Sequence, residues 1–420
     1  MGTDRLDSVG SRVINASIAR SMNERLVLSV IKRHAALSGS DISEKLGIDP
    51  STVSRILRGL VEKGLVEQEG TGEVGRKGGR RSLLWRLHPE GAAFLGIDLE
   101  ASFIRCALVN LKGEILLRRT IPAPEGPDPR TVLELLNELI HAVLAESPVP
   151  RDRVYGIGVS VPGQVNSDSG TSVFAITFKD WHNVPIAARL EERFGIPVRV
   201  DHDIRAMAFG ERWFGAAHDL RDFVCVGLRV GIGLGLVANG TVYRGGTQFA
   251  GDLGHVPIDP AGPQCSCGRR GCLEAMAGEG AIARGVEERW RREFGTRRPV
   301  SINDVHVALR EGDPAAVDVV RQSGRLVGQA LAYLVNLLDP SVIMIGGTML
   351  EINDVLHDAI RDAYDRHRTN YATQVPEIVK ATFGSWCFAV GAAALWCDAF
   401  LDGAVLAAPA WGGSERRAGR

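Results

Sequence analysis

The sequence lacks the features of membrane-spanning and disordered chains. Its 420 residues carry 49 Lys and Arg against 50 Asp and Glu, so the formal net charge is only −1. With 45% apolar residues, this balance excludes disorder as the main state. No segment approaches the roughly 18 consecutive apolar residues of a membrane helix, and the first residues hold no apolar signal core. We therefore expect a folded, cytoplasmic protein of two or three domains that does not contact the membrane.

A disulfide framework is also excluded, because seven cysteines are an odd number in a chain without an export signal. Four of them lie in apolar stretches and are predicted to be core thiols: Cys106, Cys225, Cys387 and Cys397.

The other three cysteines follow a histidine in the pattern H-x9-C-x-C-x4-C, formed by His255, Cys265, Cys267 and Cys272. Four soft ligands on a loop rich in Gly and Pro suit tetrahedral zinc. The spacing leaves no obvious open coordination position, so a structural zinc is favoured over a catalytic one. The alternative is a set of buried or redox-active thiols beside a chance histidine.

The near-zero net charge conceals an uneven distribution. Residues 23–88 hold 12 Lys and Arg against 8 Asp and Glu, a net of +4, and the rest of the chain carries −5. A basic front module on an acidic body is typical of nucleic-acid binding.

Three helices are predicted in this module. The range Asn23–His34 has an apolar face, and a second helix near Asp41–Leu46 ends at Gly47. The third follows Asp49-Pro50, an N-cap and first-turn proline, and ends at Gly64. The residues predicted to face the core are Leu26, Val27, Val30 and Ile31, and then Val53, Ile56, Leu57, Leu60 and Val61. The opposite face of the third helix presents Ser51, Thr52, Ser54, Arg55 and Arg58, which suit contacts with base edges and phosphates.

A basic hairpin is predicted to follow. The ranges Leu65–Gln68 and Ser82–Leu87 read as strands joined by a Gly-rich loop. The loop cations predicted to neutralise DNA phosphates are Arg76, Lys77, Arg80 and Arg81. Together these elements predict a winged helix-turn-helix that binds double-stranded DNA. The alternative is a helical docking module whose charged loop is simply solvated.

From Phe94 onward, β-branched runs alternate with helical patterns, which indicates an α/β body. Several motifs there resemble the ROK family of sugar-responsive repressors and sugar kinases: the cysteine cluster, FAGDLGH at Phe249–His255, GIGLG at Gly231–Gly235, VPG at Val161–Gly163 and LLDPSVIMIGG at Leu337–Gly347. The resemblance implies an actin/hexokinase-like (ribonuclease H-like) body with two α/β lobes and a zinc-binding loop. It also implies a homodimer or a dimer of dimers.

The domain division expected on this basis is an N-terminal arm over 1–21 and a winged helix-turn-helix over 22–90. The first lobe covers 91–202 and is completed by 385–402. The second lobe, with the zinc loop and a dimerisation surface, covers 203–384, and 403–420 is a flexible tail.

The resemblance further implies a sugar cleft with ligand contacts at His202, Asp203, Asp252, His255 and Glu274. In kinases of this family an Asp at the position of Asp203 acts as general base toward the sugar hydroxyl. The alternative role for Asp203 is an N-cap of a helix beginning near Ile204. Two residues depart from the kinase pattern, because His202 stands where Asn is usual and Asp252 replaces Glu, so the identity of the sugar is left open.

The ATP side departs further. The phosphate turn D-x-G-G-T is here Asp98, Leu99, Glu100, Ala101 and Ser102, and Glu100 places negative charge where phosphate would lie. The second segment, G-T-G-I-G-G-G in the kinases, begins here with Arg229-Val230, and Arg229 leaves phosphate binding open. Gly346-Gly347 survives, although such a pair also closes strand-helix turns.

These departures favour a DNA-binding regulator, most simply a repressor, whose catalytically inactive body responds to a sugar without ATP or Mg²⁺. One alternative is an ATP-dependent sugar kinase that carries a DNA-binding domain, with Asp203 as its catalytic residue. Another is an interaction module that binds no DNA and uses zinc to hold its scaffold.

Overall fold

The computed structural model describes residues 16–34, 36–71, 82–295, 300–350, 354–369 and 375–400. Contacts divide the chain into two compact units. One holds the chain up to Ala93, the turn Asn110–Glu114 and the chain from Cys397 on. The other holds Phe94–Val109 and Ile115–Trp396. Among the described residues, no helix combines the length and hydrophobicity that crossing a bilayer requires.

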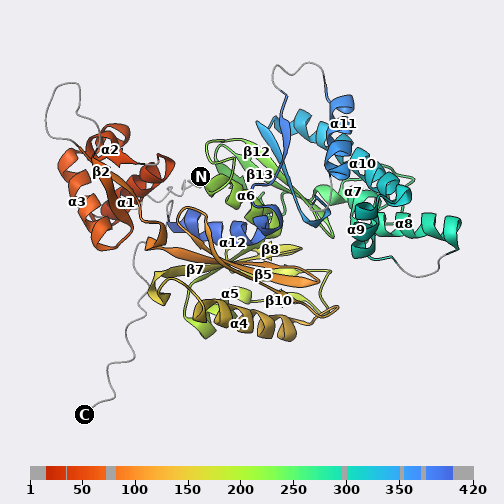
Figure 1. Ribbon diagram of the computed structural model, residues 1–420, viewed down its shortest axis with the longest axis horizontal. Helices are drawn as coiled ribbons and strands as arrows, with labels where there is room; N and C mark the ends of the chain where they lie inside the picture. The colour runs from red at the N-terminus through yellow and green to blue at the C-terminus, as the bar shows by residue number, and fades with distance from the viewer. Residues whose placement is uncertain are drawn as a thin grey trace, which may run out of the picture. The chain divides into compact units, whose positions relative to one another are not determined.

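The first unit contains a winged helix-turn-helix (Figure 1). Its elements are α1 (Ala16–Arg33), β1 (Leu37–Ser38), α2 (Gly39–Leu46), α3 (Pro50–Glu62), β2 (Val66–Thr71), β3 (Leu83–Leu87) and the 3-10 helix η1 (Pro89–Gly91). The strands form an antiparallel sheet in the order β1-β3-β2. This confirms the fold predicted for the basic module. The wing tip lies outside the described residues.

Local capping chemistry sets the ends of the two short helices. Ser38 and Asp41 form a reciprocal capping box at the start of α2, and Gly47 ends that helix in the left-handed conformation with φ 63°. The Asp49 side chain accepts from the amide of Thr52, and Pro50 occupies the first position of α3. Each of these interactions involves residues within a few positions in the sequence, so they could be predicted from it.

Two residues predicted to face the core are in fact exposed. Leu26 is 46% exposed and Val61 is 41% exposed. In α1 the buried residues are instead Val27, Leu28 and Ile31, a stripe that is rotated by one position from the predicted set and has the same helical spacing. The inner face of α3 otherwise agrees, because Val53, Ile56, Leu57 and Leu60 are all buried.

The first lobe of the body is built on a five-stranded sheet in the order β11-β7-β4-β5-β6. Its elements are β4 (Ala93–Leu99), β5 (Phe103–Asn110), β6 (Ile115–Pro122), α4 (Pro129–Ala145), η2 (Arg151–Arg153), β7 (Val154–Val161), α5 (Ile186–Phe194) and β11 (Val198–His202). A small antiparallel sheet is formed by β8 (Gln164–Asn166), β9 (Thr171–Phe174) and β10 (His182–Val184).

Helices cover both faces of the large sheet, with α4 and α5 on one face and α12 (Cys387–Asp398) on the other (Figure 1). The approach of α12 is very close: a Cβ at Gly96 would lie 1.9 Å from the carbonyl oxygen of Ala389, and one at Gly158 would lie 1.8 Å from that of Ala392. The sheet therefore needs glycine where this helix crosses it.

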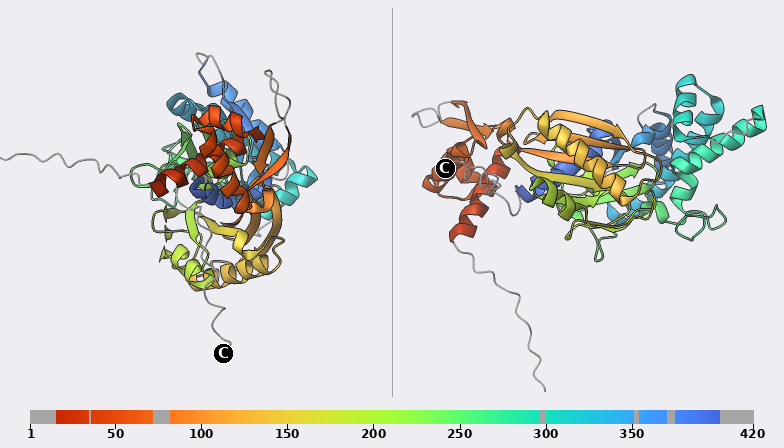
Figure 2. Two further views of the ribbon diagram at one scale, coloured as in Figure 1. Left: turned by 90° about the vertical axis from the view of Figure 1, so that its left-hand side faces the viewer. Right: turned by 90° about the horizontal axis from the view of Figure 1, so that it is seen from below.

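The second lobe has its own five-stranded sheet in the order β14-β13-β12-β15-β16. Its strands are β12 (Phe223–Leu228), β13 (Ile232–Ala238), β14 (Thr241–Tyr243), β15 (Val342–Gly346) and β16 (Glu377–Lys380). Its helices are α6 (Asp203–Trp213), η3 (Leu253–His255), α7 (Leu273–Ala277), α8 (Glu279–Phe294), α9 (Ile302–Glu311), α10 (Pro314–Leu338), η4 (Thr348–Leu350), α11 (Val355–His367) and η5 (Gly384–Trp386). Helices α8 to α11 lie together beside this sheet (Figure 1 and Figure 2). The two sheets and their helices confirm the two-lobed α/β body.

Candidate DNA interface, metal centre and ligand cleft

The outer face of α3 carries the side chains predicted to meet DNA. Ser51, Ser54, Arg55 and Arg58 are exposed, whereas Thr52 is half-buried, and its backbone amide donates to the N-cap side chain of Asp49. The Ser51 hydroxyl also donates to Asp49. The predicted wing cations Arg76, Lys77, Arg80 and Arg81 lie outside the described residues.

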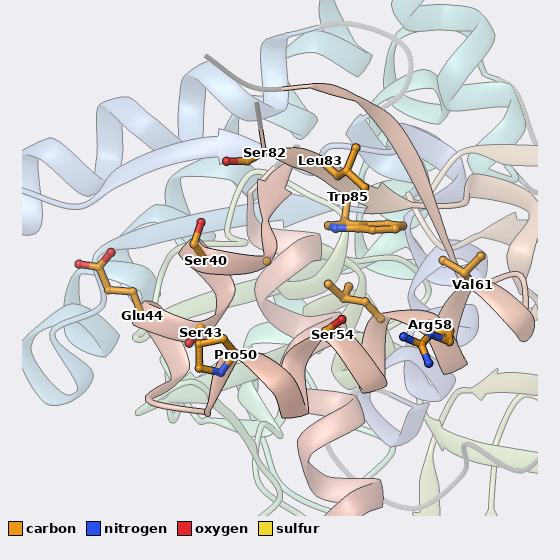
Figure 3. Close-up of a pocket in the computed structure, with 12 residues that line it drawn as sticks. Ser40, Ser43, Glu44, Pro50, Ser54, Arg58, Val61, Ser82, Leu83 and Trp85 are labelled. Atoms are coloured by element: carbon orange, nitrogen blue, oxygen red, sulfur yellow. The ribbon is translucent and has the colours of Figure 1, made fainter. Parts of the chain in front are cut away.

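A depression of about 660 Å³ lies between α2, α3 and β3 within this unit (Figure 3). Ser54 and Arg58 line it together with Ser40 and Ser43 of α2. These two serines were not among the predicted DNA contacts. The signal that could have identified them is their place on the helix before α3, which crosses the DNA backbone in helix-turn-helix proteins.

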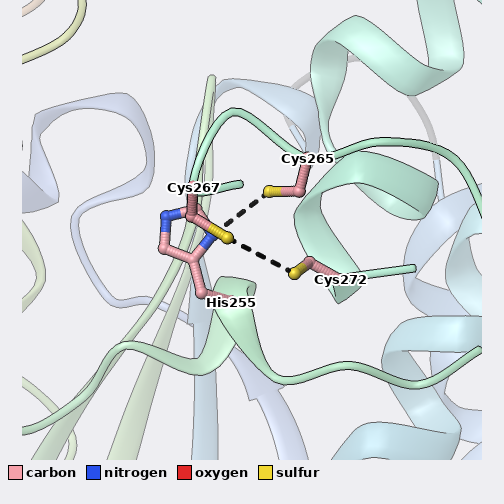
Figure 4. Close-up of side chains that lie close together, drawn as sticks. All are labelled: His255, Cys265, Cys267 and Cys272. Carbon is pink, nitrogen blue, oxygen red and sulfur yellow. Dashed lines mark hydrogen bonds between the residues drawn. The ribbon is translucent and has the colours of Figure 1, made fainter. Parts of the chain in front are cut away.

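The four predicted metal ligands converge in one loop (Figure 4). Their ligand atoms all lie within 4.8 Å of one another. The Sγ atom of Cys265 lies 3.4 Å from Nδ1 of His255, and the Sγ atoms of Cys267 and Cys272 lie 3.7 Å apart. In tetrahedral zinc with bonds of about 2.3 Å to sulfur and 2.0–2.1 Å to nitrogen, the ligands are separated by about 3.5–3.8 Å. The residues therefore fit a zinc ion.

Backbone geometry brings the three cysteines together. Gly268 donates to the carbonyl of Cys265, and Cys265 donates to that of Arg269, which folds the first two ligands into a turn. At Gly271, with φ 63°, a Cβ would lie 1.5 Å from the carbonyl oxygen of Asp259. Only glycine fits there, and the next residue is the buried ligand Cys272.

All five predicted sugar contacts line one cleft of about 360 Å³ in the body. His202 ends β11, Asp203 begins α6, Asp252 precedes η3, His255 is the last residue of η3, and Glu274 lies in the first turn of α7. His255 directs Nδ1 toward the cysteines, so its Nε2 is not used by the cluster. One residue therefore belongs both to the metal centre and to the cleft wall.

Burial determines the protonation of the two neighbouring residues at the start of α6. Burial, followed by the nearby carboxylate of Asp98, raises the pKa of Asp203 to about 7. Burial and the charge of Arg205 lower the pKa of His202 to about 4, so its imidazole is neutral at pH 7. Nδ1 of His202 lies 3.2 Å from Oδ1 of Asp203.

Asp203 is itself the first residue of α6, and its Oδ1 accepts from the amide of Ile204 at 2.8 Å. The helix thus begins one residue earlier than the N-cap alternative assumes.

The guanidinium of Arg229 is bound by three carboxylates through Nη1 and Nη2. Its Nη1 and Nη2 lie 3.0 and 3.1 Å from the two carboxylate oxygens of Asp98. Nη1 also lies 3.4 Å from Oδ2 of Asp203, and Nη2 is ion-paired with Glu100. The guanidinium stacks 4.1 Å from the centre of the Phe388 ring and is only 4% exposed. We call Asp98, Glu100, Asp203 and Arg229 the arginine cluster.

The arginine cluster joins the two segments that the resemblance to the ROK kinases assigns to phosphate binding. Asp98 and Glu100 belong to the altered D-x-G-G-T turn, and Arg229 begins the altered second segment. The surviving Gly346-Gly347 pair closes the turn after β15, since a Cβ at Gly347 would lie 2.1 Å from the carbonyl oxygen of Leu228. This supports the turn-closing role considered for that pair.

A second buried ion-pair set was not predicted from the sequence. Asp201 receives Nε of Arg205 at 2.6 Å and Nη2 of Arg244 at 2.7 Å. Although burial alone would raise it, these two guanidiniums lower the pKa of Asp201. Nη1 of Arg205 donates to the carbonyl of Gln248 at 2.9 Å, which places Gln248 on the cleft wall.

The chain matches two families in two separate regions. Residues 94–399 match the ROK family, and residues 21–77 match the MarR family. The xylose repressor of Bacillus subtilis strain 168 is 26% identical over 390 residues, which span 93% of this chain and 98% of the relative. The DNA-binding transcriptional dual regulator NagC of Escherichia coli K12 is 29% identical over 402 residues, spanning 94% and 97%.

Solved structures agree with this fold. A ROK family transcriptional regulator described as a homolog of the E. coli MLC protein has a TM-score of 0.77 at 29% identity, covering 91% of this chain and 97% of that one. A ROK family glucokinase from Streptomyces griseus, in complex with glucose and AMPPNP, has a TM-score of 0.64 at 29% identity. That match covers 99% of the glucokinase but only 72% of this chain.

Proposed function

This chain belongs to the ROK family, and we propose that it is a DNA-binding transcriptional repressor that responds to a sugar or sugar derivative. The observation that carries the proposal is the arginine cluster. It fills the phosphate-binding corner with internal ion pairs, while the winged helix-turn-helix keeps an exposed face of hydroxyls and arginines. The relatives support it, since a xylose repressor and a DNA-binding regulator align over nearly their whole lengths.

In this proposal the sugar lies in the cleft and contacts His202, Asp203, Asp252, His255 and Glu274. Carboxylates and imidazoles are suited to accept and donate hydrogen bonds to hydroxyls. Ligand binding would change the relation between the two lobes and shift the equilibrium between DNA-binding conformations. A homodimer or dimer of dimers would place two recognition helices on half-sites about one helical turn apart.

The DNA contacts we propose are Ser51, Thr52, Ser54, Arg55 and Arg58 of α3, with Arg76, Lys77, Arg80 and Arg81 of the wing. The division of the chain that goes with this function is the one expected from the sequence, with a DNA-binding domain over 22–90 and two lobes over 91–202 with 385–402 and over 203–384. The structure begins α1 at Ala16, inside the proposed arm.

We propose that the metal centre holds a structural zinc ion through His255, Cys265, Cys267 and Cys272. When bound, the zinc would crosslink the loop. The loop in turn positions two cleft residues, because His255 is itself a ligand and Glu274 lies two residues after Cys272. The remaining cysteines of the described chain are buried in the core, as predicted: Cys106, Cys225, Cys387 and Cys397.

Two single substitutions should separate DNA binding from sugar sensing. We expect Arg58→Ala to weaken operator binding by about 1–3 kcal/mol and to reduce the salt dependence, with sugar binding unchanged. Asp203→Asn should keep operator binding and lose the response to sugar, because the amide lacks the negative charge that strengthens hydrogen bonds from sugar hydroxyls and replaces one acceptor oxygen with an NH2 donor. Random-site selection with the purified protein identifies the operator sequence. Gel shifts then measure operator binding with and without D-xylose, D-glucose or N-acetyl-D-glucosamine.

Arg130→Ala is the matched control for the DNA arm, since Arg130 is exposed on α4 of the body and pairs with Glu134 one turn away. It should leave operator affinity within experimental error. The proposal fails if the purified protein shows no sequence preference at any salt concentration.

We also propose that the body lacks kinase activity. Transfer of a phosphoryl group needs donors and cations that are free to stabilise the developing charge. In the arginine cluster the guanidinium is already bound by carboxylates, and Glu100 adds negative charge. In a coupled ADP-release assay across a sugar panel, we expect turnover no faster than that of an Asp203→Ala blank. Faster turnover by the wild-type protein would favour the kinase alternative.

A further inference from the structure

We propose that the cleft selects uncharged sugars and rejects sugar phosphates, and that Glu100 and Arg229 determine this selectivity. The inference rests on the proposed function, since it takes the cleft as the sugar site. It goes beyond that function because it specifies the charge class of the effector and assigns a role to two residues that touch no predicted sugar hydroxyl.

Acidic side chains outnumber permanently charged basic ones on the cleft wall. The carboxylates on its wall are Glu100, Asp203, Asp252 and Glu274. Among the described residues of the same wall, the permanently charged cations are Arg205 and Arg229. His202 is held neutral at pH 7 by burial.

Both of these cations already have their charge balanced by carboxylates, and one nitrogen of each, Nη2 of Arg205 and Nε of Arg229, makes no hydrogen bond within the described residues. Arg205 is held by the buried carboxylate of Asp201 at 2.6 Å and by the carbonyl of Gln248. Arg229 is shared among the carboxylates of Asp98, Glu100 and Asp203. A phosphate monoester needs a free guanidinium or ammonium group in a dry site. It would have to take one from a carboxylate, and that carboxylate would then be buried without a partner.

The helix end nearest the ligand is occupied as well. A helix N-terminus commonly binds phosphate through its free first-turn amides. In α6, the Asp203 carboxylate accepts the amide of Ile204 at 2.8 Å. One first-turn amide that a phosphate would use is therefore already bound by the protein's own side chain.

The position of the excluded phosphate follows from the role of Asp203. In the kinases of the family, the Asp at this position faces the hydroxyl that receives the phosphoryl group. A sugar already phosphorylated on that hydroxyl would direct its phosphate at Asp203, and Glu100 shares the Arg229 guanidinium with that residue. An uncharged hydroxyl at the same place can donate to Asp203 without any added cation.

Calorimetric titration of the full-length protein tests the selectivity directly. The probes are two matched pairs, D-glucose with D-glucose 6-phosphate and N-acetyl-D-glucosamine with its 6-phosphate, together with inorganic phosphate. For the wild-type protein we expect the uncharged member of a bound pair to bind at least tenfold more tightly, and inorganic phosphate to give no saturable binding. If the wild-type protein binds a phosphate ester more tightly than the matching uncharged sugar, the proposal is wrong. This comparison uses the wild-type protein alone.

Glu100→Gln should then weaken the selectivity, because it removes one carboxylate from Arg229 and leaves the bidentate pair with Asp98 in place. We expect the variant to bind phosphate ester or inorganic phosphate at least tenfold more tightly than the wild-type protein does. Glu192→Gln, on the exposed outer side of α5, removes the same charge elsewhere and should change nothing.

An unchanged affinity for inorganic phosphate in a folded Glu100→Gln protein would contradict the assignment to Glu100 and Arg229. If no sugar in either pair binds and D-xylose also gives no response in the gel shift, the sugar-sensing function fails, whereas the inorganic phosphate arm still tests the role of Glu100. Operator binding measured on the same samples shows that the protein is intact.

Discussion

Cys272→Ser should abolish metal binding and cause the largest loss of stability of any single substitution in the body. Cys272 is fully buried and is the residue from which α7 starts. In zinc-finger peptides, structural zinc contributes an apparent binding free energy of about 10–16 kcal/mol that is coupled to folding. Even part of that free energy would exceed the cost of an ordinary core substitution. We expect about one zinc per wild-type chain by elemental analysis and none in the variant.

Loss of the metal in Cys272→Ser should also disturb the ligand cleft. His255 would lose its metal partner, and the loop before Glu274 would no longer be crosslinked, so the sugar response should disappear together with the metal. Chelation of the wild-type protein should have the same result, as measured by thermal unfolding and by gel shift with sugar.

Cys225→Ala is the control for this experiment, because Cys225 is buried in β12 and lies outside the cluster. It should retain one metal per chain and the sugar response. A Cys272→Ser protein that keeps stoichiometric metal would show that the cluster is not a zinc site.

Arg229→Met should destabilise the body by about 3–5 kcal/mol, because it removes the partner of a buried ion pair and leaves carboxylates behind. Those carboxylates are Asp98, Glu100 and Asp203, which are at most 7% exposed. Urea unfolding of the wild-type and variant proteins measures the difference in the free energy of unfolding.

The destabilisation should depend on pH in a definite direction. A carboxyl whose pKa is higher in the folded protein binds more protons there, so its contribution to stability decreases as pH rises between the unfolded and folded pKa values. For Asp203 this window runs from 3.8 to about 7. Without Arg229 the carboxylates would be harder to ionise, so the variant should lose more stability at pH 8 than at pH 5.

Arg289→Met provides the comparison, since Arg289 forms an exposed ion pair with Asp318. Exposed pairs contribute about 0–1 kcal/mol, and this variant should remain near the wild-type stability at both pH values. If Arg229→Met costs no more than Arg289→Met, then the arginine cluster does not hold the phosphate corner together.

The features that could be predicted from the sequence are those that depend on short-range chemistry. Gly47, Asp49 and Pro50 act on neighbouring backbone groups, so the end of α2 and the start of α3 follow from local sequence alone. The metal ligands lie within 18 residues on one loop, and their residue types alone specified the chemistry. The five cleft residues came instead from resemblance to a family.

The two wrong predictions of core residues arise because short-range patterns do not contain the tertiary contacts. Leu26 and Val61 lie next to the correct apolar stripes, and local periodicity does not decide which neighbour the rest of the module covers. The sequence likewise left the partner of Arg229 open.

Only the tertiary structure identified the partners of Arg229. Asp98 lies 131 residues before Arg229, at the end of a strand in the other lobe, and the two meet only because both sheets direct these ends into one cleft. The sequence by itself determined that a winged helix-turn-helix and a loop with four potential metal ligands are present and that the phosphate turns differ from those of the kinases. The packing of the lobes determined that the alteration creates a buried ion-pair cluster, because a charge finds its partner through the position of strands far apart in the chain.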